Sequence, residues 1–149
     1  MPTPFEVRLR VRYAECDMQG VVFNARFGDY ADLAMNEYIR TLFGDYHNLL
    51  EQDLDIQVVS MTIDWQAPGR FDDVLCCRVS PGRVGNTSFQ VSVDFHRYGS
   101  SEALARAQLT YVVVSPKELS KKPVPDNMRE VLEKGTPDRV ISHAGEDVH

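Results

Sequence analysis

The period of the apolar residues changes along the chain from helical to strand-like, and this change limits the possible folds most. From about Asn24 to Phe43, apolar side chains recur every three or four residues, which predicts an amphipathic helix. Roughly 18 residues at about 1.5 Å per residue give a helix about 27 Å long. Asn24 suits the N-cap position and Gly44 the position after the last turn. This long helix has a wide apolar stripe that a second layer must cover.

Apolar and polar residues alternate on both sides of this helix, which is typical of strands with one buried face. One such segment covers residues 6–13, and four more cover 59–65, 74–79, 89–95 and 105–113. The four later segments are joined by turns that carry Gly or Pro and have hairpin length, so we expect an antiparallel meander.

The last part of the chain has a different composition. After a loop, the sequence predicts a short helix from about Asp126, as its cap, to Lys134, ended by Gly135. The following residues have few apolar positions and no period, which predicts a mobile tail. We therefore expect one domain over residues 1–134 and a mobile tail over 135–149.

The order strand, long helix, four strands and short helix predicts an α+β domain with a five-stranded antiparallel sheet. One helix covers one face of such a sheet and leaves long edge strands, which proteins usually protect. Pairing of two edges into a continuous sheet would protect them. We therefore expect a homodimer as the smallest unit, with a dimer of dimers as the larger alternative.

Charge and composition exclude several classes of protein. The net charge of −6 argues against nucleic-acid binding, which needs concentrated Lys and Arg. No apolar run approaches the roughly 20 residues of a membrane span, and the N-terminus lacks the pattern of a secretory signal. The three cysteines and four histidines show no metal-ligand spacing, so no metal site is expected. A cytoplasmic enzyme or binding protein remains.

Residues 12–24, RYAECDMQGVVFN, connect the first strand to the long helix and carry the candidate catalytic groups. Asp17 is a carboxylate shortly before the helix, and the backbone N–H groups from Phe23 to Arg26 would lack intrahelical partners. Such N–H groups can polarise a carbonyl oxygen, while a carboxylate attacks that carbonyl or deprotonates a water. Gly20 allows the backbone to turn closely past a substrate.

Other interpretations of the acidic residues stay open. An Asp before a helix is most often a turn or cap residue, and Glu15 has the same ambiguity. On the helix, Asp29, Asp32 and Glu37 are rival carboxylates that a solvated face would explain equally well.

The segment RYAECDMQGVVFN and the helix after it resemble the signature of the 4-hydroxybenzoyl-CoA thioesterase family. That signature has an aromatic residue, an acidic residue, Asp, two variable positions, Gly, and an apolar pair before His, Asn or an aromatic residue. The VGNTSF turn and the KKPVP segment are also similar, so the resemblance covers about residues 5–133. Within the family, the chain resembles the branch of Tol-Pal-associated acyl-CoA thioesterases, although Asn24 stands where that branch has His. The resemblance implies a hotdog fold, in which a five-stranded antiparallel sheet wraps around a long central helix and dimerises edge to edge.

The resemblance also implies roles for single residues. Asp17 matches the catalytic carboxylate, which acts as nucleophile or general base, and Asn24 matches the residue whose backbone N–H binds the thioester oxygen. Gly20 and Val21 match the tight turn that lines the acyl pocket. The implied reaction is hydrolysis of an acyl-CoA or of an acylated acyl carrier protein to a free acid and a thiol. No cofactor is implied, because coenzyme A is part of the substrate.

The phosphates of coenzyme A need cationic partners. Lys117, Lys121 and Lys122 cluster after the last long strand, and Arg83 in the SPGRVGN turn is a second candidate. An acidic acyl carrier protein would approach through the same lysines, although a solvated loop explains them as well.

Two other functions remain as alternatives. A hotdog hydratase or dehydratase of enoyl or hydroxyacyl thioesters would need an Asp–His pair, and neither His47 nor His96 stands beside an Asp in a recognisable motif. The other alternative is a dimer that binds acyl thioesters without catalysis.

Overall fold

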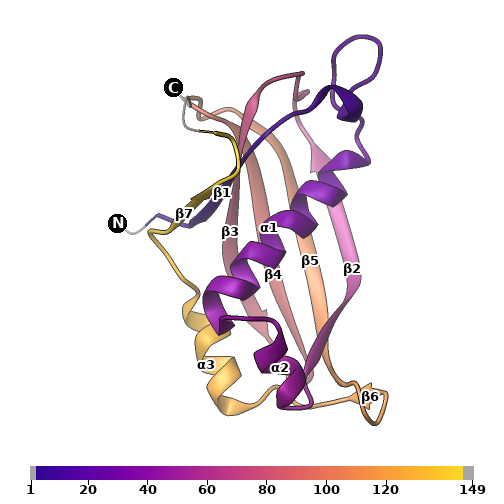
Figure 1. The fold of residues 1–149 in the computed structure, drawn as a ribbon, viewed down its shortest axis with the longest axis vertical. Helices are drawn as coiled ribbons and strands as arrows, with labels where there is room; N and C mark the ends of the chain where they lie inside the picture. The colour runs from indigo at the N-terminus through magenta and orange to yellow at the C-terminus, as the bar shows by residue number, and fades with distance from the viewer. Residues whose placement is uncertain (1–2, 146–149) are drawn as a thin grey trace.

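The computed structural model describes residues 3–145 and consists of a sheet wrapped around one long helix (Figure 1). The strands are β1 (Phe5–Arg10), β2 (Asp55–Trp65), β3 (Val74–Val84), β4 (Ser88–Arg97), β5 (Ala103–Ser115), β6 (Ser120–Lys121) and β7 (Val140–Ser142). The helices are the 3₁₀ turn η1 (Tyr13–Glu15), α1 (Arg26–Phe43), α2 (His47–Glu51) and α3 (Asp126–Lys134). None of these helices is long and apolar enough to cross a membrane.

The inner face of the sheet packs on α1 and forms the core. Alternate residues of β1, β4 and β5 point to this face, as their period predicts. The ring of Phe27 in α1 lies edge-on to Phe95 of β4, with 5.2 Å between the ring centroids. The adjacent thiols of β3 point to opposite faces, Cys77 inward and Cys76 outward, because they are neighbours in a strand.

The strand order is β2-β5-β4-β3-β1-β7, with β6 paired to β5. The expected meander is confirmed for β3, β4 and β5 but is wrong for β2, which pairs with β5 rather than with β3. The connection over residues 66–73 is longer than a usual hairpin turn. It crosses the end of the sheet, where the amides of Gln66 and Ala67 donate to the carbonyl of Leu104.

The central helix begins two residues later than expected, at Arg26. Ala25 is the N-cap residue and makes no side-chain cap hydrogen bond, so the N-cap role expected for Asn24 is wrong. The first turn is tight, because the amide of Arg26 donates to the carbonyl of Phe23 at 2.9 Å. Gly44 ends the helix with a φ of 77°, as expected.

The C-terminal region contains more structure than its composition predicts. The helix α3 has the expected bounds, although Pro125 rather than Asp126 is its N-cap residue. Beyond it, β7 pairs in parallel with β1, and the amide of His143 donates to the carbonyl of Arg8 at 2.7 Å. Residues 140–142 of the expected tail therefore form a strand, and residues 146–149 of it lie outside the described part. With β6 and β7, the sheet has seven strands rather than five.

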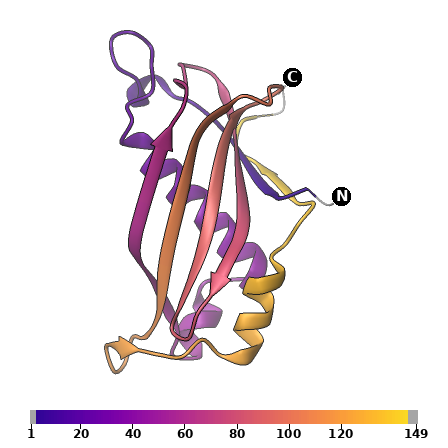
Figure 2. The ribbon, with the colours of Figure 1, turned by 180° about the vertical axis from the view of Figure 1, so that it is seen from behind.

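The outer face of the sheet carries a row of alternating charges. Figure 2 shows this face, with α1 behind the strands. The register aligns one charged residue from each of five neighbouring strands, namely Glu6, Arg78, Asp94, Arg106 and Asp64. Arg78 pairs with Glu6 at 3.0 Å and Arg106 with Asp94 at 3.6 Å. This face is therefore polar, with opposite charges side by side.

The two edges of the sheet differ. The short strand β7 covers β1, whereas β2, among the described strands, pairs only with β5. The free edge is 11 residues long and mostly exposed, and its large apolar side chains Val58, Val59, Met61 and Trp65 are 37–60% exposed. A long apolar edge of this kind is a surface that another strand can cover.

Candidate active site

The loop between η1 and α1 is folded back on itself by a tight turn at residues 17–21. The amide of Asp17 donates to the carbonyl of Val21, and the amide of Gly20 donates to the carbonyl of Asp17. Gly20 has a φ of +74°, and no heavy atom lies within 4 Å of where its Cβ would be. The turn therefore requires glycine for its backbone conformation rather than for a close approach.

The connection between β2 and β3 holds this loop from one side. The amide of Val22 donates to the carbonyl of Gly69, and the amide of Phe71 donates to the carbonyl of Gly20, both at 2.9 Å. The exposed rings of Tyr13 and Phe71 meet edge-on, with 5.8 Å between their centroids. The sequence predicted only a hairpin turn for 66–73, so its role as the support of the loop was missed.

One carboxylate oxygen of Asp17 has the structural role that is common for an Asp before a helix. The other carboxylate oxygen has no such role. Its Oδ1 accepts hydrogen bonds from the amides of Gln19 at 2.8 Å and Val21 at 3.2 Å. Its Oδ2 accepts none from residues 3–145, and the side chain is only partly buried. One carboxylate oxygen thus fixes the side chain, and the other is available to a substrate.

Two backbone amides before α1 also lack an acceptor among the described residues, whereas the sequence predicted unpaired amides at every residue from Phe23 to Arg26. The amide of Phe23 donates to the carbonyl of Glu15, and the amide of Arg26 donates to that of Phe23. The amides of Asn24 and Ala25 donate no hydrogen bond to any described residue. They lie next to the positive end of the dipole of α1, so they suit a carbonyl oxygen that gains negative charge.

The rival carboxylates are all engaged or exposed. The carboxylate of Glu15 is buried and bonded to Arg12 and Tyr30, and Glu37 is buried in contact with Arg40. Burial alone would raise the pKa of Glu15, but hydrogen bonds from Arg12 and Tyr30 outweigh it and hold this pKa below its usual range. Asp29 is exposed and pairs with Arg26 at 3.3 Å, and Asp32 is exposed.

The expected phosphate-binding residues lie at the opposite end of the protomer from Asp17. The loop with Asp17 is at the top of Figure 1, and β6, with Lys121, is at the bottom. β5 connects the two ends, and its 13 residues span about 40 Å at roughly 3.3 Å per residue. Arg83 lies near the end of β3 in the same lower region. Within one protomer, these cations are too distant to contact a substrate phosphate near Asp17.

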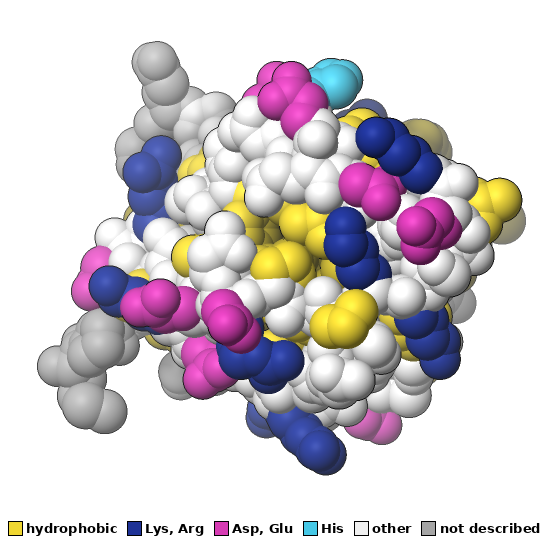
Figure 3. Space-filling view, turned by 90° about the horizontal axis from the view of Figure 1, so that it is seen from below, with side chains coloured by type: hydrophobic (Ala, Val, Ile, Leu, Met, Phe, Trp, Pro, Cys, Tyr) yellow, Lys and Arg dark blue, Asp and Glu magenta, His cyan; other side chains and the backbone are white. Residues whose placement is uncertain are grey.

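The three lysines also differ from one another. The ammonium of Lys122 lies 3.7 Å from the carboxylate of Asp53 and donates to its backbone carbonyl, so it holds the turn before β2. Lys117 and Lys121 are exposed and form no ion pair with described residues. Figure 3 looks onto this end, where basic and acidic side chains surround an apolar hollow. Lys117 and Lys121 are the two cations of the cluster that are available to a ligand.

A cavity of about 360 Å³ lies between α1 and β2. Apolar side chains of both elements line it together with polar ones, namely Asp32, Met35, Asn36, Ile39, Arg40, Tyr46, Ile56, Val58 and Tyr111. None of these residues belongs to the turn of Gly20 and Val21, which the resemblance assigned to the acyl pocket. Among the described residues, no group of His, Cys, Asp or Glu could hold a metal ion.

Relatives of known sequence match most of the chain. A protein from Escherichia coli O157:H7 named acyl-CoA thioester hydrolase YbgC is 27% identical over 128 residues, which are 85% of this chain and 93% of that protein. The acyl-CoA thioesterase YbgC of Haemophilus influenzae is 38% identical over 81 residues, which are 54% of this chain and 60% of that relative. That match therefore spans less than two thirds of the relative's length.

Solved structures share the fold. A thioesterase superfamily protein from Jannaschia matches 90% of this chain and 94% of its own, with a TM-score of 0.80 and 23% identity. A 1,4-dihydroxy-2-naphthoyl-CoA thioesterase from Synechocystis matches 86% of this chain and 94% of its own, with a TM-score of 0.76 and 23% identity. The family model of the thioesterase superfamily matches residues 19–104, more than half of the chain. The chain therefore belongs to the thioesterase superfamily and has its hotdog fold.

Proposed function

We propose that this protein hydrolyses acyl-CoA thioesters to the free acid and coenzyme A. The observation that carries this proposal is one short loop that holds both a carboxylate oxygen, on Asp17, and two amides, at Asn24 and Ala25, that have no hydrogen-bond partner among residues 3–145. Membership of the thioesterase superfamily and the activity named for the two YbgC relatives support the same reaction.

The reaction needs little beyond these groups. The amides of Asn24 and Ala25 donate to the thioester oxygen and stabilise the charge that it gains in the transition state. In one route, Oδ2 of Asp17 attacks the carbonyl carbon, the thiolate leaves, and water hydrolyses the resulting anhydride to the free acid and regenerates the carboxylate. In the other route, Oδ2 removes a proton from the water that attacks the carbonyl carbon. The two amides that bind Oδ1 fix the direction of Oδ2. The coenzyme A thiolate is a good leaving group, so it departs without a protonating residue.

Substitution of Asp17 tests this proposal. Asp17→Asn keeps an oxygen for the amides of Gln19 and Val21 but removes the nucleophile or base, so we expect kcat to fall by about 10²- to 10⁴-fold. Release of free thiol from acyl-CoAs is the measurement. Asp29→Asn is the matched control, because Asp29 is an exposed carboxylate at the start of α1, and we expect less than a threefold change. A folded Asp17→Asn variant with the activity of the unmodified protein would exclude the mechanism.

A complete site requires a second copy of the chain in this proposal. Antiparallel pairing of β2 with β2 of a partner, about a two-fold axis, would cover the free edge and form a homodimer. Because the pairing is antiparallel, the end with Asp17 would lie beside the partner's end with Lys117 and Lys121. The cavity between α1 and β2 would then receive the acyl group of a thioester bound at the other protomer's loop.

Neither alternative function is favoured by the structure. A hydratase would need a histidine close to Asp17, but His47 pairs with Asp45 and His143 lies 3.9 Å from Glu37. Binding without catalysis would appear as stabilisation by acyl-CoA with no release of thiol. Acylated acyl carrier protein remains a second possible substrate, and the same assay with both carriers distinguishes them.

A further inference from the structure

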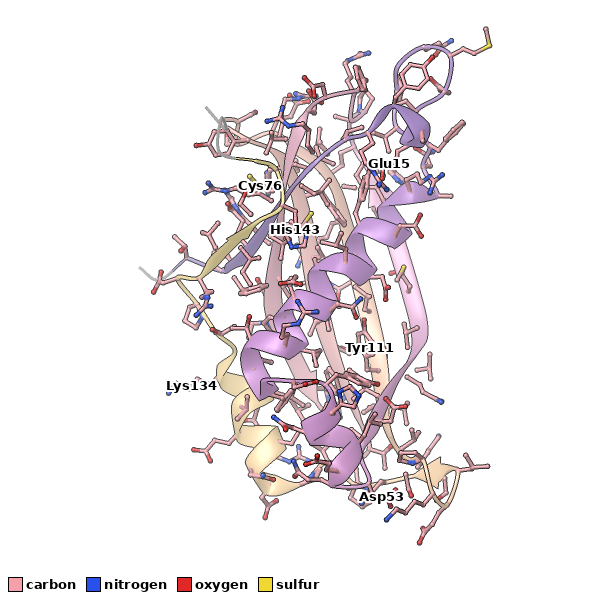
Figure 4. The ribbon with its side chains drawn as sticks, viewed as in Figure 1. Glu15, Asp53, Cys76, Tyr111, Lys134 and His143 are labelled. Atoms are coloured by element: carbon pink, nitrogen blue, oxygen red, sulfur yellow. The ribbon has the colours of Figure 1, made fainter. Side chains whose placement is uncertain are left out.

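The carboxylate of Glu15 lies where three segments of the chain meet (Figure 4). It accepts hydrogen bonds from the backbone amide of Arg12 at 2.8 Å and from the guanidinium of Arg12 at 3.0 Å, in the segment between β1 and η1. It also accepts one from the hydroxyl of Tyr30 on α1, at 3.0 Å. Glu15 is 7% exposed and Tyr30 is 3% exposed, so water competes little for these bonds.

The backbone of Glu15 makes a fourth connection. Its carbonyl accepts a hydrogen bond at 3.0 Å from the amide of Phe23, where the loop returns to the helix. Asp17 follows Glu15 by two residues, and Asn24 directly follows Phe23. One residue thus fixes both ends of the loop relative to each other, and through Tyr30 it fixes them relative to α1.

Both carboxylate oxygens of Glu15 are occupied by these donors, so Glu15 has no free oxygen for a substrate. Its side chain lines a different cavity, of about 430 Å³, on the flank of α1 that faces β1. Glu15 therefore cannot act as the nucleophile. It can act on the reaction only through the geometry of the loop.

We propose that Glu15, held by Tyr30, is a positioning residue that sets the distance between Oδ2 of Asp17 and the free amides of Asn24 and Ala25. This inference rests on the proposed function. Displacement of a reacting group by about 1 Å can cost roughly 100-fold in rate. Loss of the Glu15–Tyr30 bond therefore lowers kcat, while substrate contacts outside the loop keep KM nearly unchanged.

Three variants test this inference. We expect Glu15→Gln and Tyr30→Phe each to lower kcat by about 10- to 100-fold with KM within about threefold. We expect the double variant to be no slower than the slower single variant, because both changes act on the same contact: Tyr30→Phe removes its donor, and Glu15→Gln replaces its charged acceptor with a neutral amide oxygen. The matched control is Glu37→Gln, since Glu37 is a buried carboxylate that also pairs with an arginine three residues away but does not contact the loop. We expect its kcat within threefold of the unmodified protein.

A second measurement does not depend on catalysis. Hydrogen exchange of the amides of Gln19 and Val21, which Asp17 binds, should be faster in Glu15→Gln and in Tyr30→Phe than in Glu37→Gln. Equal kcat for Glu15→Gln and Glu37→Gln, or exchange rates unchanged by Tyr30→Phe, would overturn the positioning role. Failure of the unmodified protein to cleave any thioester would instead reject the proposed function, so the two failures are distinguishable.

Discussion

Asp17 shows that the two interpretations of an acidic residue before a helix need not exclude each other. One carboxylate oxygen closes the turn through the amides of Gln19 and Val21, and the other accepts no hydrogen bond from the described part of the chain. The type and position of this residue could be predicted from the sequence. The division of its two oxygens could not, because it depends on the backbone of the folded turn, including the positive φ of Gly20.

At Asn24 and Ala25, the backbone rather than the side chain is expected to do the chemistry. We expect Asn24→Ala to keep kcat within about threefold, because it leaves both amides in place. Ala25→Pro removes one amide, and proline can adopt the φ of −62° at this position, but it also restricts the backbone of Asn24 before it, so the fold of this variant is checked separately. We expect kcat to fall by about 10²- to 10³-fold if this amide binds the thioester oxygen.

Steady-state hydrolysis of one acyl-CoA by both variants is the measurement, and circular dichroism checks their folds. A large loss in Asn24→Ala would contradict the backbone role and assign the chemistry to the side-chain amide. Full activity in Ala25→Pro would leave the amide of Asn24 as the sole donor.

At the scale of the elements, Glu6 connects β1 to β3 on the outer face of the sheet. It accepts hydrogen bonds from Arg8 at 2.6 Å and from Arg78 at 3.0 Å. Burial alone would raise the pKa of Glu6, but these two arginines outweigh it and lower the pKa from its usual 4.5. A carboxyl with a lowered pKa stabilises the fold above its unfolded-state pKa and loses this effect as the pH falls through the folded-state value.

We therefore expect Glu6→Gln to lower the Tm at pH 7 and to differ less from the unmodified protein as the pH falls below about 4. Thermal unfolding followed by circular dichroism over a series of pH values is the measurement. A difference in Tm that stays constant from pH 7 to pH 3 would show that Glu6 contributes by packing rather than by charge.

The elements themselves could be predicted better than their pairing. The periods of α1, α3 and the long strands are local properties, so the sequence located them to within a few residues. The partner of β2 could not be predicted, because it depends on the path of residues 66–73 across the end of the sheet. The strand β7 was missed because three residues are too few to show a period.

At the scale of the whole molecule, the candidate groups are divided between two distant ends. Asp17 lies at one end of the sheet, and Lys117 and Lys121 follow β5 at the other, about 40 Å away at roughly 3.3 Å per residue. The sequence predicted each group but not this separation, because spacing along the chain does not give positions in space. A second copy, paired through β2, would bring the two sets together.

A mixed dimer tests this arrangement directly. One copy carries Asp17→Asn, and the other carries Lys117→Ala with Lys121→Ala. If each site uses the lysines of the partner, the mixed dimer has one fully intact site and one with both defects. We expect half the kcat of the unmodified dimer with an unchanged KM for acyl-CoA. If each site used its own lysines, the only site with Asp17 would lack them, and KM would stay raised.

The measurement is the KM of mixed dimers purified through two different affinity tags, compared with the dimer that carries the lysine changes on both copies. Val59→Lys is the control for assembly, because Val59 is 60% exposed on the free edge and a charge there should oppose pairing. We expect this variant to be monomeric in analytical ultracentrifugation and to lose most of its kcat/KM. An equally active Val59→Lys monomer would show that one chain forms a complete site, and the lysines would then have to act elsewhere.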